Sequence, residues 1–281
     1  MRRASRLLLP VLVSACAALA TFALADGATA AGGDPWQAAR ARGELRVGVA
    51  YVTPVPAAGA KIRTAEGLDV PAATRLGERL GLPVQRVQID PARAAQALAD
   101  GQVDVVLVNR PAGAEGRDAE AAEAVSWVGT DYAARPKAVI RSDTPLRRWA
   151  DVRGKIVCMA AAAAAAQRFA EQHGATLQIH KVPSDALVAV REGSCDVGVI
   201  DDTVWAPLMA YPEWRKFSST LAAAGPRQEL GWYANTEQAT WLKGEMQRWS
   251  REGAWKAMTD QWARDVAFDV YLDQEVPDCH G

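Results

Sequence analysis

Histidine, cysteine and phenylalanine are scarce in this chain of 281 residues, with 3, 4 and 4 copies, and the shortage excludes several classes of function. The histidines lie far apart and lack the spacing of a metal site. The cysteines are too few for a disulfide scaffold. The chain also lacks a G-x-S-x-G elbow, a P-loop and a G-x-G-x-x-G fingerprint. We therefore expect no catalysis, no resident metal and no cofactor.

Neither sign of charge is in excess. Lys and Arg number 32 and Asp and Glu 33, which gives a net charge of −1. Such a balance argues against a nucleic-acid or anionic-membrane partner. Beyond residue 25, no apolar run is long enough to span a bilayer.

The N-terminus has the pattern of an export signal. Arginines at positions 2, 3 and 6 precede an apolar stretch from 7 to 25. Two small-residue cleavage patterns follow, Ala23-Leu24-Ala25 and Ala28-Thr29-Ala30. This pattern predicts a Sec-type signal peptide over residues 1–31 and a periplasmic protein. Two alternatives stay open: a retained N-terminal anchor, and lipidation at Cys16, which ends a lipobox-like sequence.

Cleavage would leave three cysteines, Cys158, Cys195 and Cys279. An oxidising compartment then allows one disulfide and leaves at least one thiol. We expect Cys158 to be the free one, because it lies in an apolar segment where cysteine behaves as a small hydrophobe. The tail Asp278-Cys279-His280 could bind a metal, although a plain tail is the reading we favour.

Strand and helix patterns alternate along the chain in two successive runs. Strands are expected at 44–50, 84–89, 103–108, 154–159, 176–182 and 195–200, and helices at 67–80, 91–101, 160–174, 184–193 and 237–263. Each run has βαβαβ order, which implies parallel sheets with right-handed crossovers. We therefore predict an α/β fold with two lobes, 44–135 plus 231–281 for lobe one and 136–230 for lobe two.

The two runs resemble each other, because residues 97–108 align with 189–200: each is a helix end, a glycine, an aspartate and a buried strand. The chain resembles the family 3 extracellular solute-binding proteins, which supply polar amino acids and related solutes to ABC transporters. The motifs that carry this resemblance are 44–49 for the opening strand, 66–81 for "G-F-D-V-D-L…LG", 97–106 for "L-x-x-G-x-V-D", 196–201 for "D-A-x-x-x-D", and 251–253 with Trp262 for "D-G…K-W". The resemblance implies a type II periplasmic-binding-protein fold, in which two crossover strands join the lobes and the ligand lies between them.

The same resemblance nominates ligand-binding residues. In the family, an arginine after the first "V-D" strand pairs with the ligand carboxylate, and the spacing favours Arg117, with Arg110 as the alternative. Asp201 ends the second-lobe strand where the family places an ammonium-binding acid, and a helix N-cap is its other reading. Tyr51 is what remains of the family's aromatic platform.

Tryptophan is abundant, with 10 copies, and some could line an apolar cleft. We nominate Trp127 and Trp205, near the predicted lobe edges, with core packing as their alternative. Two family contacts are missing. Val55 stands where the family has a platform Phe, and the alanines at 160–166 replace the "G-T-T" turn that binds an α-carboxylate. A standard amino acid held in the family manner is therefore not expected.

These observations predict a monomeric periplasmic binding protein that delivers a small ligand to an ABC-type permease. An alternative rests on residues 105–113, which resemble the "D-V-V-x-x-x-P-A-G" turn of J-type accessory proteins encoded with methanol dehydrogenases. That likeness implies an accessory protein whose apolar cleft holds a periplasmic quinoprotein dehydrogenase. Some family members are dehydratases that use a cleft carboxylate, a role open to Glu66 or Glu115, but neither has an evident acid partner.

Overall fold

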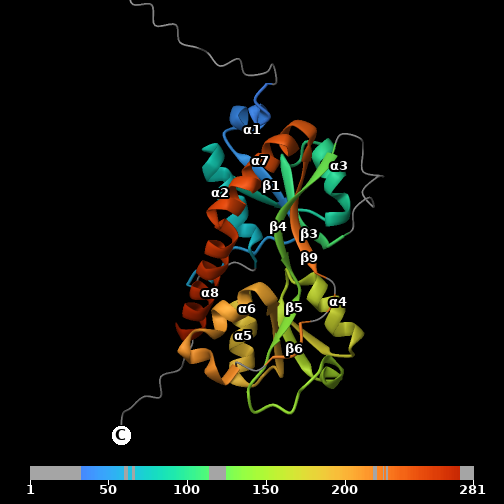
Figure 1. Ribbon diagram of the computed structural model, residues 1–281, viewed down its shortest axis with the longest axis vertical. Helices are drawn as coiled ribbons and strands as arrows, with labels where there is room; N and C mark the ends of the chain where they lie inside the picture. The colour runs from blue at the N-terminus through green and yellow to red at the C-terminus, as the bar shows by residue number, and fades with distance from the viewer. Residues whose placement is uncertain are drawn as a thin grey trace, which may run out of the picture. The chain divides into compact units, whose positions relative to one another are not determined.

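A computed structural model describes residues 33–59, 63–64, 67–113, 125–217, 220–223, 225 and 227–272. Contacts divide the chain into residues 1–33 and 34–281, and every element named below belongs to the second unit (Figure 1). Several predictions fall outside the described residues: the signal peptide with Cys16, the candidates Arg117, Glu66 and Glu115, and the tail with Cys279 and His280. Among the helices that are described, none has the length and apolar character needed to cross a membrane.

The first sheet contains five strands in the order β2-β1-β3-β9-β4. Its strands are β1 (Leu45–Val49), β2 (Val84–Gln88), β3 (Val105–Pro111), β4 (Val125–Ala134) and β9 (Gln228–Asn235), and its helices include α1 (Gln37–Arg42), α2 (Asp69–Leu80) and α3 (Ala94–Ala99). β1 runs parallel to β2 and β3, as the βαβαβ pattern predicts. β9 is antiparallel to both β3 and β4, which the sequence pattern did not indicate.

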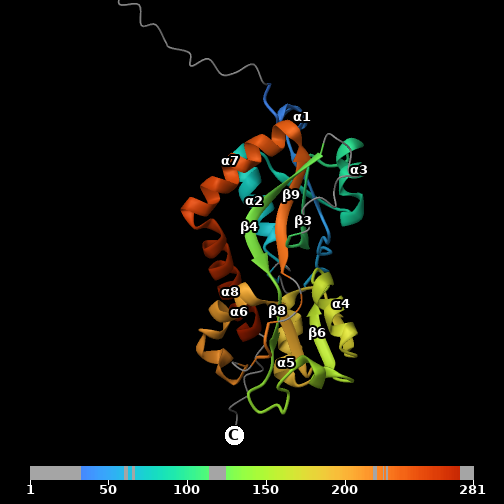
Figure 2. The same ribbon diagram turned by 45° about the vertical axis from the view of Figure 1, so that its right-hand side comes forward.

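The second sheet contains four strands in the order β5-β8-β6-β7, of which Figure 2 labels the two central ones, β8 and β6. Its strands are β5 (Pro136–Val139), β6 (Ile156–Ala160), β7 (Thr176–His180) and β8 (Val197–Asp201), and its helices are α4 (Ala164–Gln172), α5 (Pro183–Glu192) and α6 (Asp202–Met209). β6 is parallel to β7 and β8, whereas β5 is antiparallel to β8. The chain enters this sheet through Arg135, between β4 and β5, and returns to the first sheet at β9.

The apolar runs in the sequence become the central strands. β1, β3, β6 and β8 are buried along most of their length, which fits parallel strands covered by helices on both faces. Helix α2 ends at Gly81 and helix α5 at Gly193, each in the left-handed conformation that glycine adopts without strain. The apolar runs thus mark the strands, and the C-terminal glycines mark the ends of α2 and α5.

The tail forms two helices, α7 (Thr236–Glu252) and α8 (Ala254–Leu272), separated at Gly253. Asn235 caps α7, because its side chain accepts a hydrogen bond from the backbone N–H of Gln238 at 2.9 Å. α7 packs on β4 and β9 of the first sheet, the side on which we expected the whole tail. α8 instead packs on α5 and α6, and its buried residues include Val266 and Val270.

The structure corrects the prediction for Cys158. A disulfide joins Cys158 in β6 to Cys195, just before β8, with 6.0 Å between their Cα atoms. β6 and β8 are neighbours in the sheet, and Cys158 is in register with Gly198, so the two cysteines are brought within bonding reach. A buried apolar segment indicates a strand but not which strand lies beside it, and the expectation of a free thiol at this position was wrong.

Candidate functional site

Two predicted residues, Arg110 and Trp127, meet on the first sheet. Arg110 in β3 lies opposite Glu229 in β9, and its Nε lies 3.9 Å from Oε2 of Glu229. The guanidinium carbon of Arg110 lies 4.0 Å from the centroid of the Trp127 ring, a cation–π contact. The charge of Arg110 is therefore offset by Glu229, and a ligand carboxylate would have to compete with that residue.

A pair of glycines makes room for this cluster. Gly129 and Gly231 are opposite each other in β4 and β9. A Cβ on Gly231 would lie 2.1 Å from Cζ2 of Trp127, and one on Gly129 would lie 2.2 Å from Oε1 of Glu229. The absence of side chains at these two positions allows the indole and the carboxylate to lie flat on the sheet.

Asp201 forms a second cluster with residues that the sequence did not single out. It lies at the carboxyl end of β8, at the N-cap position of α6, but its side chain makes no capping hydrogen bond. Its Oδ2 instead accepts a hydrogen bond from the Tyr132 hydroxyl at 3.3 Å. The same hydroxyl lies 2.5 Å from Oγ1 of Thr203. The N-cap reading of the Asp201 side chain is therefore wrong.

A bulge in β4 presents Tyr132 to this cluster. The register of β4 against β9 shifts between Gly129 and Ala133, and Asp131 within the bulge has a φ of 63°. Thr130, which is fully buried, anchors the bulge by donating from its hydroxyl to the carbonyl of Leu230 at 2.7 Å. Bulges commonly re-aim a side chain next to a functional site. Aspartate tolerates the left-handed conformation better than most residues. The Thr-Asp pair at 130 and 131 was therefore the sequence signal that could have predicted the bulge.

The charges around Asp201 and Asp202 differ. Asp202 forms ion pairs with Arg135 at 3.5 Å and Arg227 at 3.2 Å. Asp201 has no basic partner within the part of the chain that the structure describes. Burial among protein atoms raises the pKa of Asp201 to about 6, an effect that the Tyr132 hydrogen bond reduces and the charge of Asp202 increases. The residue as a whole is nevertheless exposed to solvent.

Tyr132 itself stays protonated. Its pKa is raised well above the ordinary value, chiefly by burial and then by the charge of Asp201. Its ring stacks on Trp255 with 5.3 Å between centroids. A neutral, fixed phenol is thus held as a hydrogen-bond donor to Asp201.

The remaining predicted residues lie in less distinctive surroundings. Trp205 in α6 is partly buried against the main core, and Nζ of Lys137 lies 4.4 Å from its ring centroid, so one face of the indole is covered. Tyr51 is half-buried in the loop after β1. Val55, at the position of the missing platform Phe, is 92% exposed.

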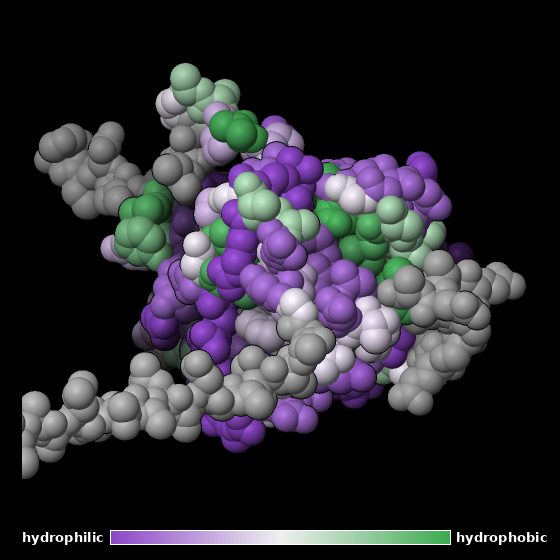
Figure 3. Space-filling model, turned by 90° about the horizontal axis from the view of Figure 1, so that it is seen from above, coloured by the Kyte–Doolittle hydropathy of each residue, from purple (hydrophilic) through white to green (hydrophobic). Residues whose placement is uncertain are grey.

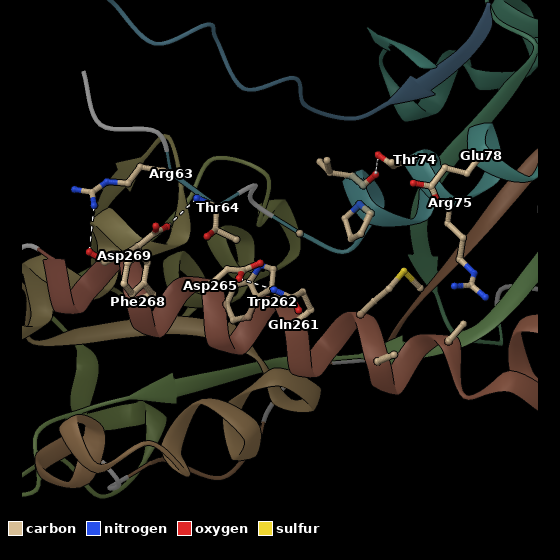
Figure 4. A pocket seen from close by; sticks show the side chains of 16 residues that line it. Arg63, Thr64, Thr74, Arg75, Glu78, Gln261, Trp262, Asp265, Phe268 and Asp269 are labelled. Carbon is tan, nitrogen blue, oxygen red and sulfur yellow. Dashed lines mark hydrogen bonds between the residues drawn. The ribbon is translucent and has the colours of Figure 1, made fainter. Parts of the chain in front are cut away.

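A cavity of about 750 Å³ lies elsewhere, between α2 and α8 (Figure 4). Its walls combine apolar side chains such as Trp262 and Phe268 with charged ones. Asp269 accepts a hydrogen bond from the backbone N–H of Thr64 at 2.8 Å, and Asp265 accepts one from Gln261 at 2.6 Å. The five predicted residues that the structure describes do not line this cavity.

The structure also brings together three potential metal ligands that lie far apart in the sequence. Cys158, His180 and Cys195 offer ligand atoms that all lie within 4.8 Å of one another. Each comes from a different strand or strand entry of the second sheet, and 22 residues separate Cys158 from His180 in the sequence, so no local motif marks them.

Residues 70–237 match the family described as "ABC transporter, phosphonate, periplasmic substrate-binding protein". This segment is more than half of the chain. The chain belongs to this family. As a member of the phosphonate-type periplasmic substrate-binding proteins, it acts outside the cytoplasmic membrane, binds a small molecule and serves an ABC transporter. The family consists of binding proteins, which agrees with the expected lack of catalysis.

Solved structures confirm the predicted fold. The P235GK mutant of ArgBP from T. maritima is 17% identical, with a TM-score of 0.55 over 82% of this chain and 99% of that one. The ancestral cationic amino acid solute-binding protein AncCDT-1 is 18% identical, with a TM-score of 0.54 over the same shares. The substrate-binding protein of an amino acid ABC transporter is also 18% identical, with a TM-score of 0.52 over 78% of this chain and 99% of that chain. At these identities the likeness shows the two-lobed type II fold alone. Among curated proteins, none matches this chain.

The comparisons therefore confirm that the chain is a periplasmic binding protein for an ABC transporter, but they do not identify its ligand. The matching family is the phosphonate type, and none of the proteins reported above is a J-type accessory protein.

Proposed function

We infer that this phosphonate-type binding protein captures a small solute that carries a positively charged group and delivers it to its ABC importer. The observation that carries the proposal is the Asp201 carboxyl. Asp201 is the last residue of the buried strand β8 and is exposed to solvent. Its carboxylate accepts a hydrogen bond from Tyr132. Binding sites in α/β proteins lie at the carboxyl ends of strands, which is where this group is found.

The neighbouring charges support a cationic ligand group at Asp201. Arg135 and Arg227 neutralise Asp202, and Arg110 faces Glu229. Asp201 alone among these acids lacks an ion-pair partner in the described residues, and the surrounding protein atoms disfavour its charged form. A ligand ammonium would offset that effect, so binding energy would come from completing the pair.

The acidic end of the ligand would need a different kind of contact. Residues 160–166 are all alanine and offer no hydroxyl to an α-carboxylate. Backbone N–H groups at the start of a helix such as α4 can hold a compact anion without side chains. The family description names phosphonate. An aminoalkylphosphonate combines both requirements, with its ammonium group at Asp201.

Three compounds of similar size test the ammonium and phosphonate ends of the ligand separately. They are aminoethylphosphonate, ethylphosphonate and ethylamine. We expect aminoethylphosphonate to raise the melting temperature most and ethylphosphonate least, as measured by thermal shift at millimolar ligand. Asp201→Asn should lose at least roughly tenfold in affinity for aminoethylphosphonate by calorimetry, because a hydrogen bond to a charged group contributes about 1.5–3 kcal/mol.

Asp143→Asn is the matched control, because this exposed acid pairs with Arg141 away from the two clusters. It should bind as the unmodified protein does. Equal affinity of the Asp201 variant and the unmodified protein would contradict the proposal. So would stronger binding of ethylphosphonate than of aminoethylphosphonate.

The alternative accessory role predicts a different outcome. A quinoprotein dehydrogenase would then co-purify with the protein from the periplasm, and the three compounds would produce no thermal shift. The family match favours the importer role.

A further inference from the structure

The disulfide of the second sheet has a third potential metal ligand beside it. Cys158 lies in β6, Cys195 two residues before β8, and His180 at the end of β7, which flanks β6 on its other side. The two sulfur atoms and a ring nitrogen of His180 all lie within 4.8 Å of one another. Cys158 and His180 project from the same face of neighbouring strands, since Cys158 pairs with Gln178 and Ala160 with His180.

The surroundings leave one nitrogen of the His180 imidazole without a hydrogen-bond partner among the described residues. Cys158 and Cys195 are buried, at 0% and 3% exposed, and His180 is half-buried. Nε2 of His180 is buried and has no hydrogen-bond partner among the described residues. An imidazole nitrogen without another partner can bind a metal ion.

We propose that reduction of the Cys158–Cys195 disulfide converts this cluster into a Cys₂His site for a soft metal ion, Zn²⁺ or Cu⁺. Two thiolates and an imidazole are the ligand types that both ions prefer. In a tetrahedral zinc site with bonds of about 2.3 Å, the two sulfurs stand about 3.8 Å apart. All three ligand atoms already lie within 4.8 Å of one another, so the imidazole nitrogen is near an ion bound between the two sulfurs.

Electrons and protons balance in this conversion when a dithiol is the reductant. The dithiol gives two electrons and two protons to the disulfide, which becomes two protein thiols, and is itself oxidised to a disulfide. The metal ion then displaces the two thiol protons to solvent and forms two metal–sulfur bonds and one metal–nitrogen bond. Water takes the fourth position in the zinc case. The metal keeps its oxidation state throughout.

Co²⁺ is the spectroscopic probe for the zinc arm. The exported chain without residues 1–31 carries Cys279→Ser in this experiment, so that only the paired cysteines can contribute. The oxidised protein should show no thiolate-to-cobalt absorption. After reduction and removal of the dithiol, one Co²⁺ per chain should bind with that absorption, and Zn²⁺ should displace it. A Cu⁺ competition against a chromophoric chelator tests the second ion.

His180→Ala should weaken metal affinity by at least roughly tenfold, since it removes one of three ligands. Thiol titration should show that its disulfide still forms, which separates ligand loss from misfolding. His173→Ala is the matched control, because His173 hydrogen-bonds to the carbonyl of Phe169 and its ring lies 4.4 Å from the Phe169 ring, centroid to centroid. It should bind metal as the unmodified protein does.

The proposal fails if the reduced protein binds neither ion more tightly than a Cys158→Ser/Cys195→Ser variant. It also fails if His180→Ala binds as tightly as His173→Ala. If reduction alone unfolds the chain, circular dichroism will show the loss of the native spectrum. Added Zn²⁺ should then restore that spectrum. A chain that stays unfolded with Zn²⁺ overturns the proposal.

Discussion

The hydroxyl of Tyr132, in β4 of the first sheet, donates a hydrogen bond to the carboxylate of Asp201, at the end of β8 in the second sheet. The two residues lie 69 positions apart in the sequence. The phenol meets the acid because a bulge turns β4 just before the chain passes from one sheet to the other. This bond therefore couples the candidate ligand-binding acid to the region where the two sheets join.

Tyr132→Phe tests that coupling. The variant removes the donor that lowers the pKa of Asp201, so this pKa should rise further above 6. Carbon-detected NMR titration of the carboxyl measures it directly. Stability should fall by about 1 kcal/mol, as for a typical hydrogen bond. Tyr271→Phe is the control, since Tyr271 is 57% exposed on α8 and should affect neither quantity. An unchanged Asp201 titration would contradict the assigned role of the hydroxyl.

The pH dependence of stability should carry the signature of Asp201. Its pKa in the folded protein, about 6, lies above the ordinary 3.8. Its contribution to stability is therefore complete below about pH 4 and is lost as the pH rises through 6. Asp201→Asn should melt at a higher temperature than the unmodified protein at pH 8, and the difference should vanish at pH 4.

Asp143→Asn should behave in the opposite way. Its hydrogen bond to Arg141 lowers the pKa of Asp143, so the acid contributes stability above the ordinary pKa and loses it as the pH falls. Melting temperatures of both variants from pH 2 to pH 8, a range that extends below the ordinary pKa of 3.8, provide the comparison. A difference of the same sign for both would show that net charge, and not local environment, causes the effect.

Gly231→Ala should disrupt the Arg110–Trp127 cluster. The added Cβ would lie 2.1 Å from the Trp127 ring, which must move, and overpacking of this kind costs about 1–3 kcal/mol. Denaturant unfolding monitored by tryptophan fluorescence measures the loss. Gly244→Ala is the matched control: Gly244 lies within α7 with nothing near its would-be Cβ, and alanine there should stabilise by up to about 1 kcal/mol.

The disulfide predicts the thiol count of the exported chain. With Cys158 and Cys195 paired, thiol titration of the denatured, unreduced protein should find a single reactive thiol, that of Cys279. Cys195→Ser should lower the unfolding free energy by roughly 2–4 kcal/mol, as expected when a loop of 37 residues is released. No reactive thiol would indicate an intermolecular bridge, and three would indicate that the native pair does not form.

Local patterns predicted much of the fold. The uninterrupted apolar runs became β3 and β8, and Gly81 and Gly193 end helices as expected. These features depend on neighbours along the chain, so the sequence reveals them directly.

The missed features depend on partners far away in the sequence. The order β5-β8-β6-β7 decides that Cys158 meets Cys195 and His180. The register of β3 against β9 decides that Arg110 faces Glu229. A single sequence shows apolar periodicity, but it does not show which strands lie side by side. Arg110, Trp127 and Asp201 could be nominated, whereas Glu229 and Tyr132 could not.

The position of β9 has a consequence for the order in which the chain folds. The second sheet is built from one continuous segment that is complete at Asp201, so it can form while later residues are still being exported. In the first sheet β4 lies at the edge beside β9, and β9 begins only at Gln228. β4 must therefore wait for a partner synthesised about a hundred residues later, and such long-range pairing is slow. We expect the second sheet to gain hydrogen-exchange protection first during refolding, and the Tyr132–Asp201 bond to be among the last native contacts to form.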